Sequence, residues 1–108
     1  MSGKVSTGSV LLLHDAGLHA RPSVQLTKLA KRFASRIEVA VTDAGPWIDA
    51  KSIVKVMATK APKGTLLYFR ADGDDAKPAV DALIALVDGD FGEARTAEPE
   101  DLADVGTG

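Results

Sequence analysis

Apolar side chains recur at helical spacing in the first third of the chain. They occupy positions i, i+3, i+4 and i+7 of one helical face, as Leu26, Leu29, Ala30 and Phe33. Pro22 precedes this stripe and suits the first turn of a helix, where its missing N–H would have had no partner. The pattern therefore predicts an amphipathic helix that begins at residues 20–22.

A second and longer apolar stripe predicts the last helix of the chain. It consists of Ala76, Ala79, Val80, Leu83, Ile84 and Val87. Asp74 and Asp75 precede it as candidate N-terminal caps, and Gly89 is expected to end it. A brief third helix is predicted at residues 53–59, because Ser52 is well suited to cap it and Pro62 and Gly64 stop it.

Four segments show the features of β-strands. A short apolar run at residues 9–15 is closed by a turn, and residues 37–41 alternate between apolar and polar side chains. Residues 47–49 can form only a short strand, and residues 66–70 are rich in β-favouring side chains. The order of elements is then β-α-β-β-α-β-α.

This order predicts an open-faced β-sandwich of the α+β class. Short strands interleaved with helices favour one four-stranded antiparallel sheet with three helices on one face. Residues 9–91 would form this single domain. Residues 1–8 are small and polar and are expected to be a flexible leader, whereas residues 92–108 are expected to be a disordered acidic tail.

Charge and composition exclude several function classes. The formal net charge is −2, so no basic field would hold nucleic acid or an anionic membrane. No cysteine is present, which excludes disulfides, thiolate zinc sites and cysteine nucleophiles. His14 and His19 are the two histidines, and no acidic pair completes a metal site with them, so no metal or other cofactor is expected. The longest apolar run is too short to span a membrane, and we expect a cytoplasmic protein.

The segment best suited to take part in a reaction is Gly17-Leu18-His19-Ala20-Arg21-Pro22-Ser23. This segment places an imidazole at a helix N-terminus, where unpartnered amides and the helix dipole favour an anion. A phosphoryl group on His19 would meet those amides and the guanidinium of Arg21. Gly17 lets the backbone turn sharply before the histidine.

Residue types alone leave another interpretation open, in which His19 is an ordinary surface histidine near a helix cap. No second acid–base group lies nearby in the sequence, and no glycine-rich loop offers to bind a nucleotide. These absences suit a phosphoryl carrier better than a kinase or an enzyme with a small-molecule substrate.

Two motifs resemble those of one known family. Residues 17–22 are similar to the active-site signature of HPr, the histidine-containing phosphocarrier of the bacterial phosphotransferase system, which serves sugar transport. Residues 49–57, Asp-Ala-Lys-Ser-Ile-Val-Lys-Val-Met, resemble the second signature of that family, around its regulatory serine. Both motifs stand in the family's order, and the predicted element order agrees with the family's fold.

The resemblance implies a role for several residues. His19 would accept phosphate through Nδ1 from phosphorylated enzyme I and deliver it to an enzyme IIA-type domain. Arg21 would steady the phosphoryl group and contact both partners. Ser52 aligns with the serine that an HPr kinase/phosphorylase modifies in some bacteria. An exposed apolar docking patch beside it aligns with Ile53, Val54 and Met57.

Alternatives remain open for each of these roles. Ser52 is also explained as a helix cap alone, and Ile53 and Met57 could belong to the core. Two departures bear on partners: Ala16 replaces a residue that is polar in many relatives, and Lys55 stands where the family commonly has a small side chain. The chain could instead be a non-catalytic regulatory interaction module that acts through the Ser52 helix.

Strand alternation predicts an apolar patch on the outer face of the sheet. Val10, Leu12, Leu67 and Phe69 are expected to face the helices. The outward set would then comprise Leu11, Leu13, Leu66 and Tyr68. Such a patch is more apolar than a monomer usually exposes, so we expect the leader, the tail or a second copy of the chain to cover it.

Overall fold

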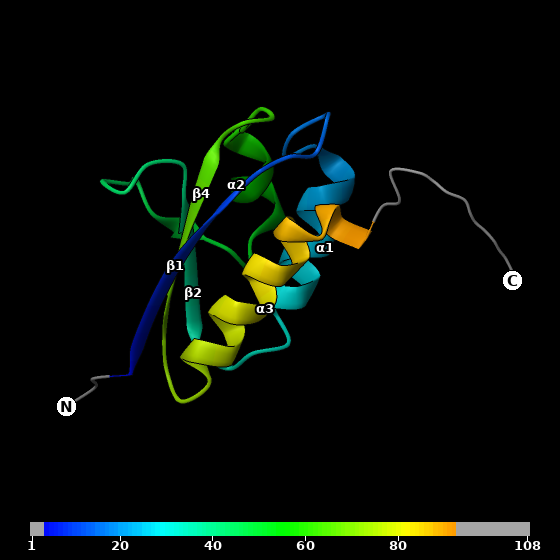
Figure 1. The fold of residues 1–108 in the computed structure, drawn as a ribbon. Coiled ribbons are helices and arrows are strands. Elements are labelled where there is room, and N and C mark those ends of the chain that lie inside the picture. The colour runs from blue at the N-terminus through cyan, green and yellow to red at the C-terminus, as the bar shows by residue number, and fades with distance from the viewer. Residues whose placement is uncertain (1–3, 93–108) are drawn as a thin grey trace, which may run out of the picture.

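The computed structural model describes residues 4–92, and these form an α+β open-faced sandwich (Figure 1). One antiparallel sheet in the order β1-β4-β2-β3 is covered on one face by helices. The strands are β1 (Val5–Leu11), β2 (Arg36–Ala40), β3 (Ile48–Asp49) and β4 (Leu66–Asp72). The helices are α1 (Ala20–Ala30), α2 (Ile53–Ala58), α3 (Ala76–Asp88) and the 3₁₀ turn η1 (Asp90–Gly92). The predicted fold class and element order are confirmed.

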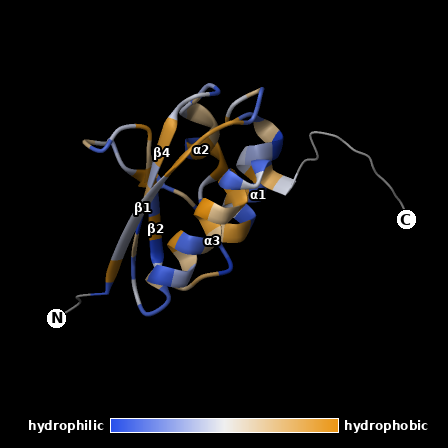
Figure 2. Cartoon of the chain, in the orientation of Figure 1, coloured by the Kyte–Doolittle hydropathy of each residue, from blue (hydrophilic) through white to orange (hydrophobic). Residues whose placement is uncertain are grey.

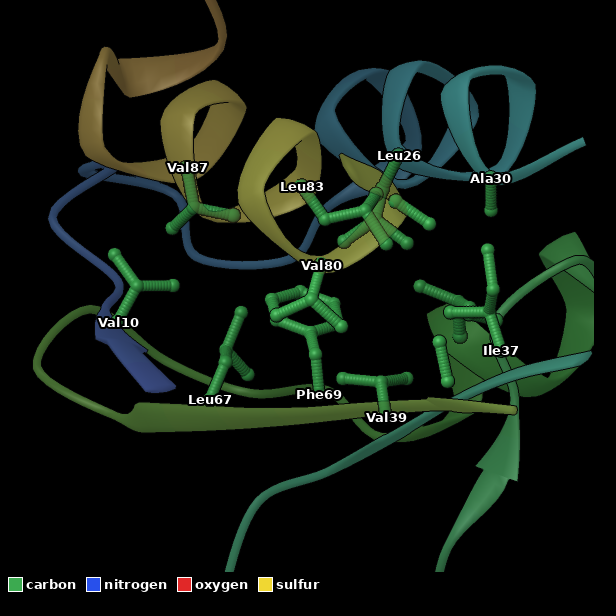
Figure 3. Packing of buried hydrophobic residues seen from close by; sticks show 14 of the residues in the cluster. Val10, Leu26, Ala30, Ile37, Val39, Leu67, Phe69, Val80, Leu83 and Val87 are labelled. Carbon is green, nitrogen blue, oxygen red and sulfur yellow. The ribbon is translucent and has the colours of Figure 1, made fainter. Parts of the chain in front are cut away.

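The core lies between the sheet and the helices (Figure 3). Leu67 and Phe69 project from β4 toward α1 and α3, and both are fully buried. Leu26 of α1 and Leu83 of α3 meet them from the other side. Burying a large apolar side chain contributes about 1.5–3 kcal/mol, so this layer dominates the stability of the domain.

The hydrophobic pattern of the helices matches this two-layer arrangement. Apolar and hydrophilic residues alternate along α3, as expected for a helix with one face on a core (Figure 2). Within residues 4–92, no helix combines the length and the apolar character that crossing a membrane would require.

The first strand differs from its prediction at both ends. It begins at Val5 rather than at residue 9 and ends at Leu11, so residues 5–8 are strand and not leader. Val5 to Gly8 pair with the last four residues of β4. A Cβ added to Gly8 would lie 2.5 Å from Cδ1 of Ile84, so a larger residue there would require that side chain of α3 to shift. The inward residues here are small, which is why alternation does not reveal the strand.

Asp75 stabilises a different part of the fold from the one predicted. Its side chain makes no capping hydrogen bond to α3. It accepts hydrogen bonds instead from the Ala34 amide at 2.8 Å, the Ser35 amide at 2.9 Å and the Ser35 hydroxyl. The Ser35 hydroxyl and then the Ala34 amide hold the pKa of the Asp75 carboxyl below its ordinary value. Asp75 therefore ties the loop before β2 to the start of α3.

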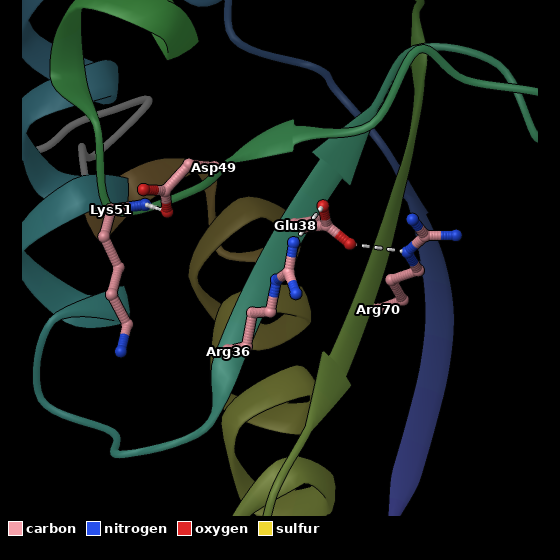
Figure 4. Close-up of polar contacts among 5 residues, drawn as sticks. All are labelled: Arg36, Glu38, Asp49, Lys51 and Arg70. Atoms are coloured by element: carbon pink, nitrogen blue, oxygen red, sulfur yellow. Dashed lines mark hydrogen bonds and ion pairs between the residues drawn. The ribbon is translucent and has the colours of Figure 1, made fainter.

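The outer face of the sheet is polar at its centre (Figure 4). Nε of Arg70 donates to Glu38 at 2.8 Å across β4 and β2, and the Arg36 guanidinium lies 3.9 Å from the same carboxylate. The Arg70 guanidinium also lies 4.3 Å from the centre of the Trp47 ring, in a cation–π contact. This network sets the charge of the outer face, away from the helices.

The predicted apolar patch occupies one end of that outer face. Leu11 and Leu66 pair across β1 and β4, and Tyr68 lies two residues farther along β4 on the same face. Leu11, Leu13 and Leu66 are exposed and Tyr68 is half-buried, whereas the four inward residues are buried. The facing of the strands is confirmed. Residues 1–3 and 93–108 lie outside the described residues, so coverage of the patch stays a prediction.

Candidate functional site

His19 is the N-cap residue of α1. Its backbone is extended, with φ −79° and ψ −173°, and its carbonyl accepts the first helical hydrogen bond from the Ser23 amide at 3.0 Å. The side chain is exposed and makes no capping hydrogen bond. The imidazole is therefore free of the task that an N-cap side chain usually performs.

The helix start offers positive charge to whatever binds at His19. Ala20 and Arg21 open the helix, so their amides have no intrahelical acceptor, and Pro22 has no N–H. No carboxylate lies in this first turn to compete for those amides. The helix end itself contributes about 0.3–1 kcal/mol toward an anion. The exposed Arg21 adds a guanidinium that stays ionised at physiological pH.

The backbone before His19 is held by a contact with the chain beyond α2. The Leu18 amide donates to the Ala61 carbonyl at 2.8 Å, and the Ser23 hydroxyl donates to the Leu18 carbonyl at 3.2 Å. Gly17 has φ +70°, and a Cβ there would lie 2.3 Å from the Ala61 oxygen. Only glycine accommodates both the left-handed backbone and this close approach. The backbone of Gly17 and Leu18 is thus held against Ala61, while the side chain of the next residue, His19, stays exposed.

His14 is placed differently from His19. Its Nδ1 accepts a hydrogen bond from the Ala16 amide at 3.2 Å. Its ring meets that of Phe91 edge to face, with centroids 5.9 Å apart. His14 is half-buried in the loop, whereas His19 presents its ring to solvent. Of the two histidines, His19 is therefore the one whose ring is exposed to a reaction partner.

The predicted docking residues lie on α2. Ser52 is its N-cap, and its hydroxyl accepts a hydrogen bond from the Lys55 amide at 3.4 Å, so the predicted cap is confirmed. Val54 is 74% exposed and Met57 is 39% exposed, while Ile53 is half-buried. Neither Met57 nor Ile53 belongs to the buried cluster, which decides against the core interpretation for both.

A pocket of about 400 Å³ brings the two predicted sites together. His19 lines it from the start of α1 and Met57 lines it from α2. Lys60 also lines it, a residue that the sequence reasoning did not single out. No motif marks Lys60, because its place beside His19 depends on how the chain after α2 packs against the loop. Ala16, Leu18, Ala20, Ala61 and Pro62 complete the lining.

Known proteins share both the sequence and the fold. Residues 7–88 match the family described as the PTS HPr component phosphorylation site. The chain is 42% identical over 84 residues to the phosphocarrier protein HPr of Cupriavidus necator, which covers 78% of this chain and 92% of that protein. It is 35% identical over 99 residues to the multiphosphoryl transfer protein of Haemophilus influenzae, covering 91% of this chain and 20% of that protein.

A solved structure agrees with the sequence comparisons. HPr of Thermoanaerobacter tengcongensis superposes with a TM-score of 0.75 at 33% identity, over 82% of this chain and 97% of that one. The family match over residues 7–88 includes β2 to β4, most of β1, the three α-helices and the segment that carries His19. The chain therefore belongs to the HPr family, the phosphocarriers of the phosphotransferase system, which hand on a phosphoryl group rather than catalyse a reaction of their own.

Proposed function

We propose that His19 accepts a phosphoryl group from phosphorylated enzyme I in the cytoplasm and passes it to an enzyme IIA-type protein. The observation that carries this proposal is the exposed imidazole of His19 at an open helix N-terminus with no carboxylate in its first turn. The multiphosphoryl transfer protein among the relatives fits a relay of this kind.

The proposed step exchanges one phosphorus–nitrogen bond for another. The lone pair of neutral His19 Nδ1 attacks the phosphorus, and the bond to the donor's histidine breaks as the donor nitrogen regains its electron pair. In the second transfer a IIA histidine is the nucleophile, and the bond between phosphorus and His19 Nδ1 breaks as that nitrogen regains its electron pair. The open amides of α1 and the Arg21 guanidinium stabilise the negative charge that accumulates on the phosphoryl oxygens. The partner proteins supply the remaining machinery.

Incubation with enzyme I and radiolabelled phosphoenolpyruvate tests this function directly. We expect one label per chain, stable in alkali and lost in acid, as a phosphohistidine requires. Omission of enzyme I should leave the chain unlabelled. A chain that takes no label from enzyme I, but is phosphorylated on Ser52 by an HPr kinase, would instead be a regulatory interaction module.

Arg21→Ala is expected to slow transfer to His19 by about 10- to 100-fold. A hydrogen bond to a charged group contributes about 1.5–3 kcal/mol, and the proposal gives the guanidinium one such bond with the phosphoryl group. Arg21 is exposed, so its removal should change the free energy of unfolding by about 0.5 kcal/mol or less. Rapid-quench transfer assays and urea unfolding measure the two effects.

Arg21→Lys is the matched control for that variant. It keeps the charge but loses the planar fork, so we expect only partial recovery of the transfer rate. Transfer that is unchanged in both variants would remove Arg21 from the proposed mechanism.

We also propose that Ser52 is a regulatory phosphorylation site and that α2 docks enzyme I through Ile53, Val54 and Met57. Ser52→Asp should weaken binding to enzyme I by about tenfold, because a charge beside this apolar surface must be desolvated on docking. Ser52→Asn is the matched control, since asparagine caps a helix equally well without a charge. Titration calorimetry of both variants against enzyme I measures the difference. Equal affinities would show that this face is not the docking surface.

A further inference from the structure

Lys60 adopts a backbone conformation that lysine rarely takes. It directly follows Thr59, the C-cap of α2, and has φ +51°. Glycine is the usual residue at this position because it enters the left-handed region without a steric penalty. The protein thus accepts backbone strain where a glycine would remove it. Strain that persists in this way is a reason to ask what the side chain does.

Neighbouring hydrogen bonds hold Lys60 in that conformation. Its amide donates to the Met57 carbonyl at 3.1 Å, and the Ala61 amide donates to the Thr59 hydroxyl at 3.4 Å. The Ala61 carbonyl in turn accepts from Leu18, next to His19 in the chain. Lys60 is therefore part of the segment that anchors the His19 loop, and its position relative to that loop is set by the backbone.

Lys60 is exposed and lines the same pocket as His19. Among the eight residues that form the lining, Lys60 is the only lysine or arginine, and none is a carboxylate. The rest of the lining is mostly apolar, so no anionic group of the lining competes with the phosphoryl group for this ammonium. Arg21 does not line this pocket, so Lys60 brings a cation to His19 from a second element.

We infer that Lys60 is an electrostatic positioning residue for the phosphoryl group on His19. This inference rests on the proposed function and adds a residue from the α2 side of the site. The ammonium attracts the dianionic phosphoryl group as it arrives and favours its retention. It also gives this lysine a role at a position where the backbone favours glycine.

The decisive variant is Lys60→Gly, because its two expected effects have opposite signs. Relief of the left-handed strain should raise the urea midpoint of unfolding. Transfer from phosphorylated enzyme I should nevertheless slow by up to about fivefold at low ionic strength, as expected for the loss of one exposed charge interaction with a dianion. At 1 M salt the difference from wild type should vanish, since the Debye length falls to about 3 Å.

Three further variants separate charge from backbone effects. Lys60→Gln keeps the strained side-chain position without the charge and should lose as much rate as Lys60→Gly, whereas Lys60→Arg should stay near wild type. Lys63→Gln removes a neighbouring positive charge that pairs with Asp15 at 3.0 Å and does not line the pocket. Its rate should change less than that of Lys60→Gln.

The outcomes distinguish this inference from the function beneath it. If wild type is labelled normally and Lys60→Gln transfers at the wild-type rate at low salt, Lys60 has only a structural role and the inference fails alone. The same holds if the loss in Lys60→Gln persists at 1 M salt. If wild type takes no label from enzyme I, the proposed function and this inference fail together.

Discussion

His19→Gln is expected to abolish labelling by phosphorylated enzyme I. Glutamine keeps a polar side chain at the helix start, but the lone pair of its amide nitrogen is delocalised into the carbonyl group and does not attack phosphorus. His19 is exposed and its side chain makes no capping hydrogen bond, so the unfolding free energy should change by about 0.5 kcal/mol or less. Phosphate incorporation and urea unfolding of the same preparation measure the two results.

His14→Gln is the matched control for this variant. Nδ1 of His14 is engaged by the Ala16 amide, and the ring packs on Phe91, so His14 is not placed to receive the phosphoryl group. This variant should still take one label per chain. Label that persists in His19→Gln, or that disappears only in His14→Gln, would place the phosphoryl group on a different residue from the one proposed.

Gly17→Ala should destabilise the domain and slow phosphotransfer together. An alanine in the left-handed region costs about 1–2 kcal/mol. The new Cβ would also lie 2.3 Å from the Ala61 carbonyl oxygen, a backbone atom that cannot rotate away, and overpacking of this kind costs about 1–3 kcal/mol. Relief requires the loop to move away from Ala61, and His19 moves with it. Urea unfolding and the enzyme I transfer assay measure these two losses.

Gly64→Ala is a closely matched control. Gly64 also has a left-handed backbone, with φ +94°, but an added Cβ would meet no atom within 4 Å. It should therefore show the backbone cost without the steric cost, and transfer to His19 should be unaffected. If the two variants lose equal stability and transfer equally well, the contact between Gly17 and Ala61 does not hold the site in place.

The elements of this fold were largely predictable because their signals are local. An amphipathic helix shows its period within two or three turns, and Leu26, Leu29 and Ala30 of the predicted stripe lie on α1, whereas Phe33 follows the end of that helix. Ser52 predicts the start of α2 because its hydroxyl can cap the first turn of a helix. The inward facing of Leu67 and Phe69 also followed from the alternation of side chains between the two faces of a strand.

Other features are decided by contacts between distant segments. The early start of β1 depends on pairing with β4, about sixty residues away in the chain, and Gly8 belongs to the strand because it pairs with Phe69. Asp75 is a residue type that commonly caps helices, yet its carboxylate accepts hydrogen bonds from the Ala34 and Ser35 amides on another segment. No local pattern identifies such partners, because a polar side chain can satisfy its hydrogen bonds in several equivalent ways.

The candidate site likewise combines features that adjacent residues encode with features that depend on contacts between distant segments. The order of His19, Arg21 and Pro22 is enough to place an imidazole and a guanidinium at a helix start, since proline favours the first turn and the helix dipole follows from the backbone. That Lys60 lines a pocket with His19, and that Gly17 must remain bare against Ala61, depends on contacts between distant segments. Helix starts are encoded by a few adjacent residues, whereas the packing of α2 against the loop arises from the collapse of the whole core.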